Sequence, residues 1–109
     1  MNWINKSTIP EERFKDYQGF LYEVEFTDGT YYFGKKDFGT NDKWKEYEGS
    51  AKSRGRREVL QKTILRVVRT KRELTFREAE MLFVKGVLFD NDCLNNNILG
   101  KFWGNVADG

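Results

Sequence analysis

The 109-residue chain has no histidine, one cysteine and one proline. Histidine is the commonest metal ligand and general base, so its absence excludes Ser-His-Asp triads, Cys-His pairs and ordinary zinc sites. A single cysteine, Cys93, excludes an internal disulfide and is typical of a reducing compartment. The N-terminus carries no apolar leader, and no apolar run reaches membrane-spanning length. We therefore expect a cytoplasmic protein that does not contact membranes.

The chain nevertheless has enough apolar residues to fold. Its 39% hydrophobic content supports one modest core, which argues against global disorder. We expect residues 1–109 to form a single domain. Within it, residues 1–17 would be an N-terminal extension with a short helix, because Ser7 and Thr8 precede Pro10 and two acidic residues.

Charge is distributed unevenly along the chain. The net charge is only +2, but residues 52–72 carry nine basic residues and one acidic residue. That segment therefore has a charge of +8, and the rest of the chain has −6. Such segregation favours a polyanionic partner, although a solvated basic surface would have the same composition.

The pattern of elements predicts an α+β domain. Strands are expected at about 20–26 and 30–35 around an Asp28-Gly29 turn, and a third strand at 63–69. Residues 37–50 resemble a loop, and residues 56–61 a short helix. A final helix should run from near Thr75 to about Leu88, with an apolar stripe formed by Phe76, Ala79, Phe83 and Val87. We thus predict a small three-stranded antiparallel sheet flanked by helices.

In order and spacing, several short segments resemble the GIY-YIG nuclease superfamily, most closely the Seg-type homing endonucleases that phages encode. The matching segments are Gly19–Tyr22, Tyr31–Lys36, Trp44–Ser50, Ile64–Arg66, Glu73–Ala79, Leu94–Asn95 and Ile98–Phe102. The resemblance implies a GIY-YIG-like fold and cleavage of DNA with one divalent metal, Mg²⁺ or Mn²⁺. It implies no small-molecule cofactor, and a place in the host-cell cytoplasm if a phage encodes the protein.

In that family a helix glutamate holds the metal, a hairpin tyrosine helps to activate water, and a basic residue stabilises the scissile phosphate. The resemblance assigns the metal to Glu78, with Glu80 in reserve, and catalytic roles to Tyr22 and Tyr32. Glu78 has a structural alternative, because Thr75-Phe76-Arg77-Glu78 also matches a helix capping box. An unperturbed phenol has a pKa of about 10, so a tyrosine acting as a base needs help from a metal or cations.

The remaining candidates are cations and an asparagine. The family's phosphate-binding arginine has two alternative counterparts, Lys36 and Arg54, and Asn95 matches a late asparagine that orders the site. Basic side chains near these positions are expected to bind the DNA backbone. They are Lys35, Lys36, Lys52, Arg54, Arg56 and Arg57.

The hairpin register tests the resemblance. A two-residue Asp28-Gly29 loop places Tyr22 and Tyr32 on opposite faces of the sheet. A three-residue loop with Gly29 in the left-handed position pairs Phe26 with Thr30 and Tyr22 with Gly34. Only this second register brings both phenols to one face, so we predict it.

A different function also fits parts of the sequence. Residues 37–43 lack the long basic loop of the Seg-type relatives, and the family arginine has no unambiguous counterpart. These departures favour a catalytically inactive relative that binds nucleic acid or a host protein as a regulator or inhibitor.

Overall fold

The computed structural model describes residues 2–49, 54–95, 97–98 and 102–103. In chain order its elements are β1 (Trp3–Asn5), η1 (Glu11–Asp16), β2 (Gly19–Phe26), β3 (Tyr31–Asp37), η2 (Lys43–Glu46), β4 (Val59–Val68), α2 (Lys71–Val84), η3 (Val87–Phe89), β5 (Asn97–Ile98) and β6 (Phe102–Trp103), where η denotes a 3₁₀ helix. The main sheet has the strand order β1-β4-β2-β3, and β5 pairs with β6 in a separate two-stranded sheet.

The α+β class is confirmed, but the three-stranded antiparallel sheet is wrong. The main sheet is mixed and four-stranded, because β1 pairs in parallel with β4. Trp3 lies opposite Lys62 in this pairing, and the Lys6 amide continues it by donating to the Ile64 carbonyl. A strand of three residues is too short to show alternation in the sequence. The segment expected as an extension therefore supplies a sheet edge as well as the short helix η1.

The β2–β3 hairpin has the predicted three-residue turn. The Phe26 amide donates to the Thr30 carbonyl, and Gly29 has φ +88°. Tyr22 is paired with Gly34 and Val24 with Tyr32. Strand alternation then places Tyr22 and Tyr32 on the same face of the sheet, as predicted.

The helix predicted for residues 56–61 is wrong, because β4 already begins at Val59. Val59 pairs with Phe26, and the Gln61 side chain donates to Glu25 at 2.8 Å. Pairing along the whole length of β2 therefore outweighs the local preference of this segment.

The last helix begins earlier than predicted. Thr70 caps α2, because its side chain accepts a hydrogen bond from the Glu73 amide. The alternative box at Thr75–Glu78 is wrong, since both residues lie inside the helix. α2 ends at Val84, before Gly86 in the left-handed region (φ +61°).

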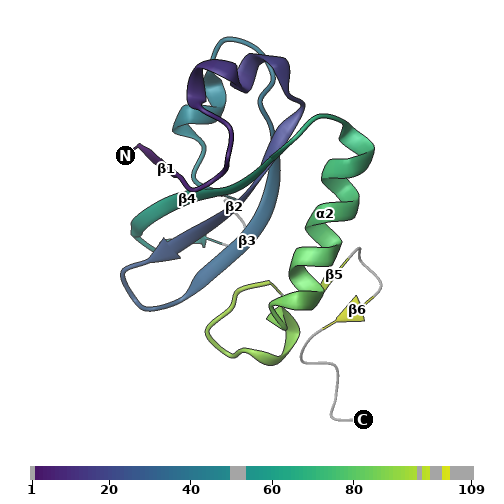
Figure 1. Ribbon diagram of the computed structural model, residues 1–109. Helices are drawn as coiled ribbons and strands as arrows, with labels where there is room; N and C mark the ends of the chain where they lie inside the picture. Colours follow the sequence, from purple (N-terminus) through teal and green to yellow (C-terminus); the bar gives the residue numbers. More distant parts are fainter. Residues whose placement is uncertain (1, 50–53, 96, 99–101, 104–109) are drawn as a thin grey trace.

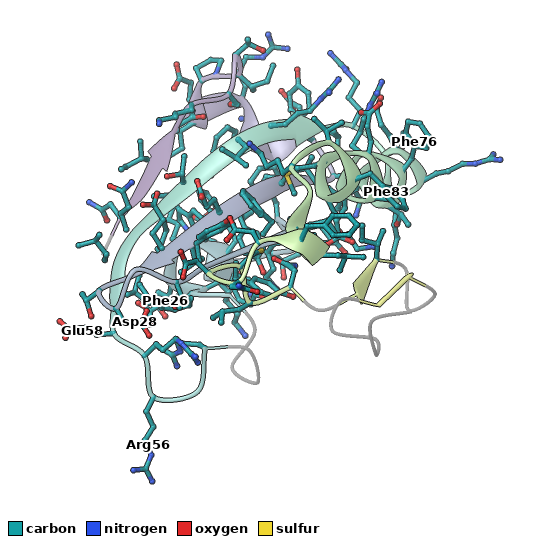
Figure 2. All side chains as sticks on the ribbon, turned by 90° about the horizontal axis from the view of Figure 1, so that it is seen from below. Phe26, Asp28, Arg56, Glu58, Phe76 and Phe83 are labelled. Atoms are coloured by element: carbon teal, nitrogen blue, oxygen red, sulfur yellow. The ribbon has the colours of Figure 1, made fainter. Side chains whose placement is uncertain are left out.

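The predicted apolar stripe, which Leu82 also joins, is confirmed at the buried Leu82 and Val87 and wrong at the two phenylalanines. Phe76 and Phe83 are 60% and 51% exposed, and Figure 2 shows them on the outer side of α2. Leu74, which was not part of the predicted stripe, and Leu82 are the buried residues of α2, and they pack against the apolar residues of β2 and β3. Glu78 lies between them at helical spacing, on the face that packs against the sheet.

The sheet separates two layers. α2 covers one face, while η1 and η2 lie together on the other side (Figure 1). The larger apolar cluster is on the η1–η2 side and is rich in aromatic rings: Phe14, Phe20, Tyr22, Phe26, Phe38 and Trp44. No helix in the described part of the chain is both long and apolar enough to cross a membrane.

Candidate active site

Three tyrosines meet on the sheet face opposite α2. The Tyr22 ring lies 6.3 Å from the Tyr32 ring and 5.7 Å from the Tyr47 ring, between centroids. The Tyr22 and Tyr47 hydroxyls are hydrogen-bonded at 3.3 Å. Tyr22 is buried at 1% exposure, whereas Tyr32 and Tyr47 are half-buried. Tyr22 therefore lies beneath two phenols that are open to solvent.

Two glycines make room for the Tyr22 ring. A Cβ on Gly34 would lie 2.4 Å from the Tyr22 hydroxyl oxygen, so the ring occupies the space that a side chain would fill. Gly49 approaches the same ring from the loop after η2, with φ +90°. The Gly34 position in the hairpin register is thus a condition for seating Tyr22.

Glu78 approaches the site from α2. Its carboxylate accepts a hydrogen bond from the backbone N–H of Lys35, and the Lys35 amino group donates to Thr75 at 2.8 Å. Burial raises the pKa of Glu78, and the charge and amide of Lys35 partly oppose this effect. Burial is also the main cause of the raised pKa of Tyr22, to which Tyr47, Tyr32 and Glu78 contribute. The charge of Glu78 is thus the smallest of the causes that raise the pKa of Tyr22.

Asn95 binds the backbone of β3 along the same open edge that Glu78 contacts. β3 is an edge strand, and alternate N–H groups of such a strand lack a strand partner. The Phe33 amide donates to Asn95 Oδ1, and Asn95 Nδ2 donates to the Phe33 carbonyl, both at 2.8 Å. The Tyr31 amide donates to the Asp92 carbonyl. Asn95 and Glu78 therefore accept hydrogen bonds from two successive outward-facing amides of β3, those of Phe33 and Lys35. Asn95 thus fixes β3 beside the tyrosines.

The donor set fits a hard divalent cation only in part. Among the described residues no group of three or more acidic, cysteine or histidine side chains converges. Glu78 offers one carboxylate at the edge of β3. Mg²⁺ commonly keeps several waters and takes further oxygens from substrate phosphates, so one protein carboxylate is compatible with it. The reserve candidate Glu80 is exposed and is paired with Arg77 at 3.0 Å, away from this group.

The candidate cations occupy different places. The Lys36 amino group lies 4.8 Å from the centre of the Tyr47 ring, within the tyrosine cluster. Arg54 pairs with Glu48 at 2.8 Å, and its Nε has no hydrogen-bond partner among the described residues. Glu48 stands between Tyr47 and Gly49 in the chain, so this pair holds Arg54 near the loop that touches Tyr22.

The other basic candidates lie toward the hairpin turn or outside the described residues. Arg57 pairs with Asp28 at 3.2 Å. Arg56 points away from the protein at the end of the molecule where Asp28 and Glu58 lie (Figure 2). Lys52 lies outside the described residues. Of the predicted basic candidates that the structure describes, Lys35 and Lys36 are therefore the two in direct contact with residues of the site.

Two residues of this region were not predicted. Tyr47 contributes a phenol, and Lys62 donates from β4 to the Tyr47 carbonyl. The segment Trp44–Ser50 matched the family motif, but it lacks periodicity, so nothing in the sequence assigned its tyrosine a role. Lys62 lies in the basic segment and had the appearance of a solvated residue.

Comparison with known families identifies the class of protein. The α+β fold carries two tyrosines of the β2–β3 hairpin on one face of its sheet. Residues 3–98 match the model of the family described as "Putative endonuclease segE, GIY-YIG domain". The match spans almost the whole chain, so the protein belongs to this family of GIY-YIG endonuclease domains. No curated protein and no solved structure matched the chain.

Proposed function

We propose that the protein is a metal-dependent endonuclease that hydrolyses phosphodiester bonds in DNA. The observation that carries the proposal is the hairpin register, which places Tyr22 and Tyr32 on one face. Tyr47 and Lys36 join them there, and Glu78 stands at the adjacent edge of β3. The Seg-type family extends the proposal to a homing-type, phage-encoded enzyme that uses Mg²⁺ or Mn²⁺.

The chemistry needs a nucleophile, neutralisation of the charge that develops on phosphate, and support for the leaving oxygen. Glu78 would hold a divalent cation, which supplies charge neutralisation when bound. Lys36 stands on the face of the tyrosines and is placed to contact the scissile phosphate. Arg54 is the second candidate for this contact, and reaching the phosphate would require it to leave Glu48.

The tyrosines divide the remaining work. A phenol already keeps its proton at neutral pH, and burial raises the pKa of Tyr22 further, so Tyr22 acts as a hydrogen-bonding group and not as a free base. Tyr32 and Tyr47 reach solvent and are placed to orient the attacking water. The Tyr22 hydroxyl would fix the orientation of Tyr47 through the bond between them.

The test is the conversion of supercoiled plasmid to nicked or linear DNA with Mg²⁺ or Mn²⁺. We expect cleavage by the wild-type protein, its loss in Glu78→Ala, and a strong reduction in Tyr22→Phe. Glu80→Ala is the matched control, since it removes an exposed carboxylate from the same helix. Cleavage that survives Glu78→Ala would refute the assigned metal ligand. A gel shift without cleavage by any form, in either metal, would support the inactive nucleic-acid-binding relative instead.

A further inference from the structure

A buried amino group lies directly behind Tyr47. Lys62 in β4 is only 1% exposed, yet its Nζ donates to two carbonyls, those of Lys45 and Tyr47, each at 2.9 Å. The same nitrogen lies 4.7 Å from the centre of the Trp3 ring. Among the described residues no carboxylate is within ion-pair distance of it. Lys62 therefore binds backbone oxygens of one short segment.

Placing an ammonium group here is costly. Burial lowers the pKa of Lys62, and Glu48 and Glu46 offset this only in part. An apolar side chain would avoid the desolvation cost. What the amino group gains is the pair of carbonyls, together with an aromatic face that favours a cation. The contacts of Lys62 thus converge on the segment that carries Tyr47.

Trp3 holds the same segment from β1. Its indole Nε1 donates to the Trp44 carbonyl at 3.0 Å, and Trp3 is the register partner of Lys62 in the parallel β1–β4 pair. Three carbonyls between residues 44 and 47 are therefore held by two neighbouring side chains from two adjacent strands. Tyr47 is also the residue that ends η2, and its own side chain points to Tyr22.

We propose that Lys62, with Trp3, is the positioning device that holds Tyr47 in hydrogen-bonding distance of Tyr22. The expected effect on the cleavage rate rests on the proposed nuclease function, whereas the positioning of Tyr47 does not. Lys62 is buried and touches no substrate, so its loss should lower the rate of the chemical step and leave DNA affinity unchanged. Displacing a positioned group by about 1 Å can cost roughly 100-fold in rate.

The kinetic experiment is a double-mutant cycle. Lys62→Met keeps an unbranched side chain of similar length and removes the ammonium group. We expect single-turnover cleavage of duplex DNA to slow by about 10- to 100-fold, with the same dissociation constant for DNA. Combined with Tyr47→Phe, Lys62→Met should cause little further loss, because both changes disable one unit. Independent, multiplicative losses would overturn the proposal. Lys15→Met, an exposed lysine of η1, controls for the change of charge.

A second readout does not depend on activity. In protein labelled with ¹³C at the ζ carbon of tyrosine, Lys62→Met should shift the Tyr47 and Tyr22 signals. The Tyr31 signal should not move, because its hydroxyl donates to Asp90 on another part of the surface. Unchanged Tyr47 and Tyr22 signals would refute the positioning role even if the protein cleaves no DNA. If Lys62→Met fails to fold, Trp3→Phe replaces it in the cycle and the spectra, because it removes the bond to Trp44 and keeps an aromatic ring at this position. The Tyr47 signal is then the readout, since the Trp3 ring itself contacts Tyr22.

Discussion

Replacing Gly34 by alanine tests whether the hairpin seats Tyr22 by leaving one position of β3 without a side chain. The added Cβ would lie 2.4 Å from the Tyr22 hydroxyl oxygen and 2.6 Å from its Cζ, whereas ordinary contacts begin at 3.4 Å. The phenol must therefore move by about 1 Å. Tyr22 is almost fully buried between Trp3, Phe20 and Tyr47, so there is no free space to receive it.

The sign of the effect on stability is informative. Gly34 does not have a left-handed backbone, and without crowding an alanine there would stabilise the protein by about 0.4–1 kcal/mol. Overpacking of a core instead costs about 1–3 kcal/mol. We expect Gly34→Ala to lose about 1–3 kcal/mol in urea unfolding. We also expect it to lose roughly 100-fold in the rate of DNA cleavage, because Tyr22 and Tyr47 separate.

Gly39→Ala is the matched control. Gly39 has φ +62° and no atom within 4 Å of the position of its Cβ, so alanine costs about 1–2 kcal/mol through the backbone alone. It should lower stability by a similar amount and leave the cleavage rate unchanged below its melting temperature. A Gly34→Ala protein as stable and as active as the wild type would refute the reasoning. If Gly34→Ala and Gly39→Ala lose the same amount of activity, the loss comes from lower stability and not from a displaced Tyr22.

Three further changes test separate contacts. Glu78→Gln should raise the free energy of unfolding at pH 7 but leave it unchanged near pH 4, as measured by urea unfolding at several pH values. The reason is that the pKa of Glu78 is raised in the folded protein, so the stability of the wild type falls as the pH rises from about 4 through that pKa. Asn95→Ala removes both hydrogen bonds to Phe33 and should cost about 1–3 kcal/mol, with faster hydrogen exchange at the Phe33 amide; an unchanged exchange rate would contradict the account. Glu48→Gln should raise DNA affinity severalfold by releasing Arg54, and more than Glu46→Gln, which removes the same charge without an Arg54 contact; equal effects in fluorescence anisotropy would show that Arg54 does not bind DNA.

The hairpin could be predicted because its information is local. Asp28-Gly29 and the alternating residues on both sides locate the turn and leave two registers. The family resemblance chose between them, because only one register brings Tyr22 and Tyr32 to the same face. The start of α2 could not be chosen in the same way, since Thr70–Glu73 and Thr75–Glu78 both have the form of a capping box. β1 escaped prediction because three residues carry no periodicity. Its pairing depends on the exposed edge of β4, which exists only in the folded chain.

The parts of the site outside the hairpin depend on tertiary packing. The predicted apolar stripe contained Phe76 and Phe83 beside Leu82, but the helix buries Leu74 and Leu82, and Glu78 lies between these two at helical spacing. Tyr47 belongs to a loop whose course is held by side chains from β1 and β4. In the sequence Lys62 resembles any other residue of the basic segment. Only the folded structure shows that its amino group binds two carbonyls and faces an indole ring.

The central claim is that this arrangement cuts DNA through Glu78. The most direct measurement compares the wild type with Glu78→Gln in single-turnover cleavage of end-labelled duplex DNA with Mg²⁺ or Mn²⁺, alongside the dissociation constant for the same duplex. The account predicts cleavage by the wild type, a rate at least about 100-fold lower in the variant, and a similar dissociation constant for both. Equal rates, or binding without cleavage by either protein, would contradict it.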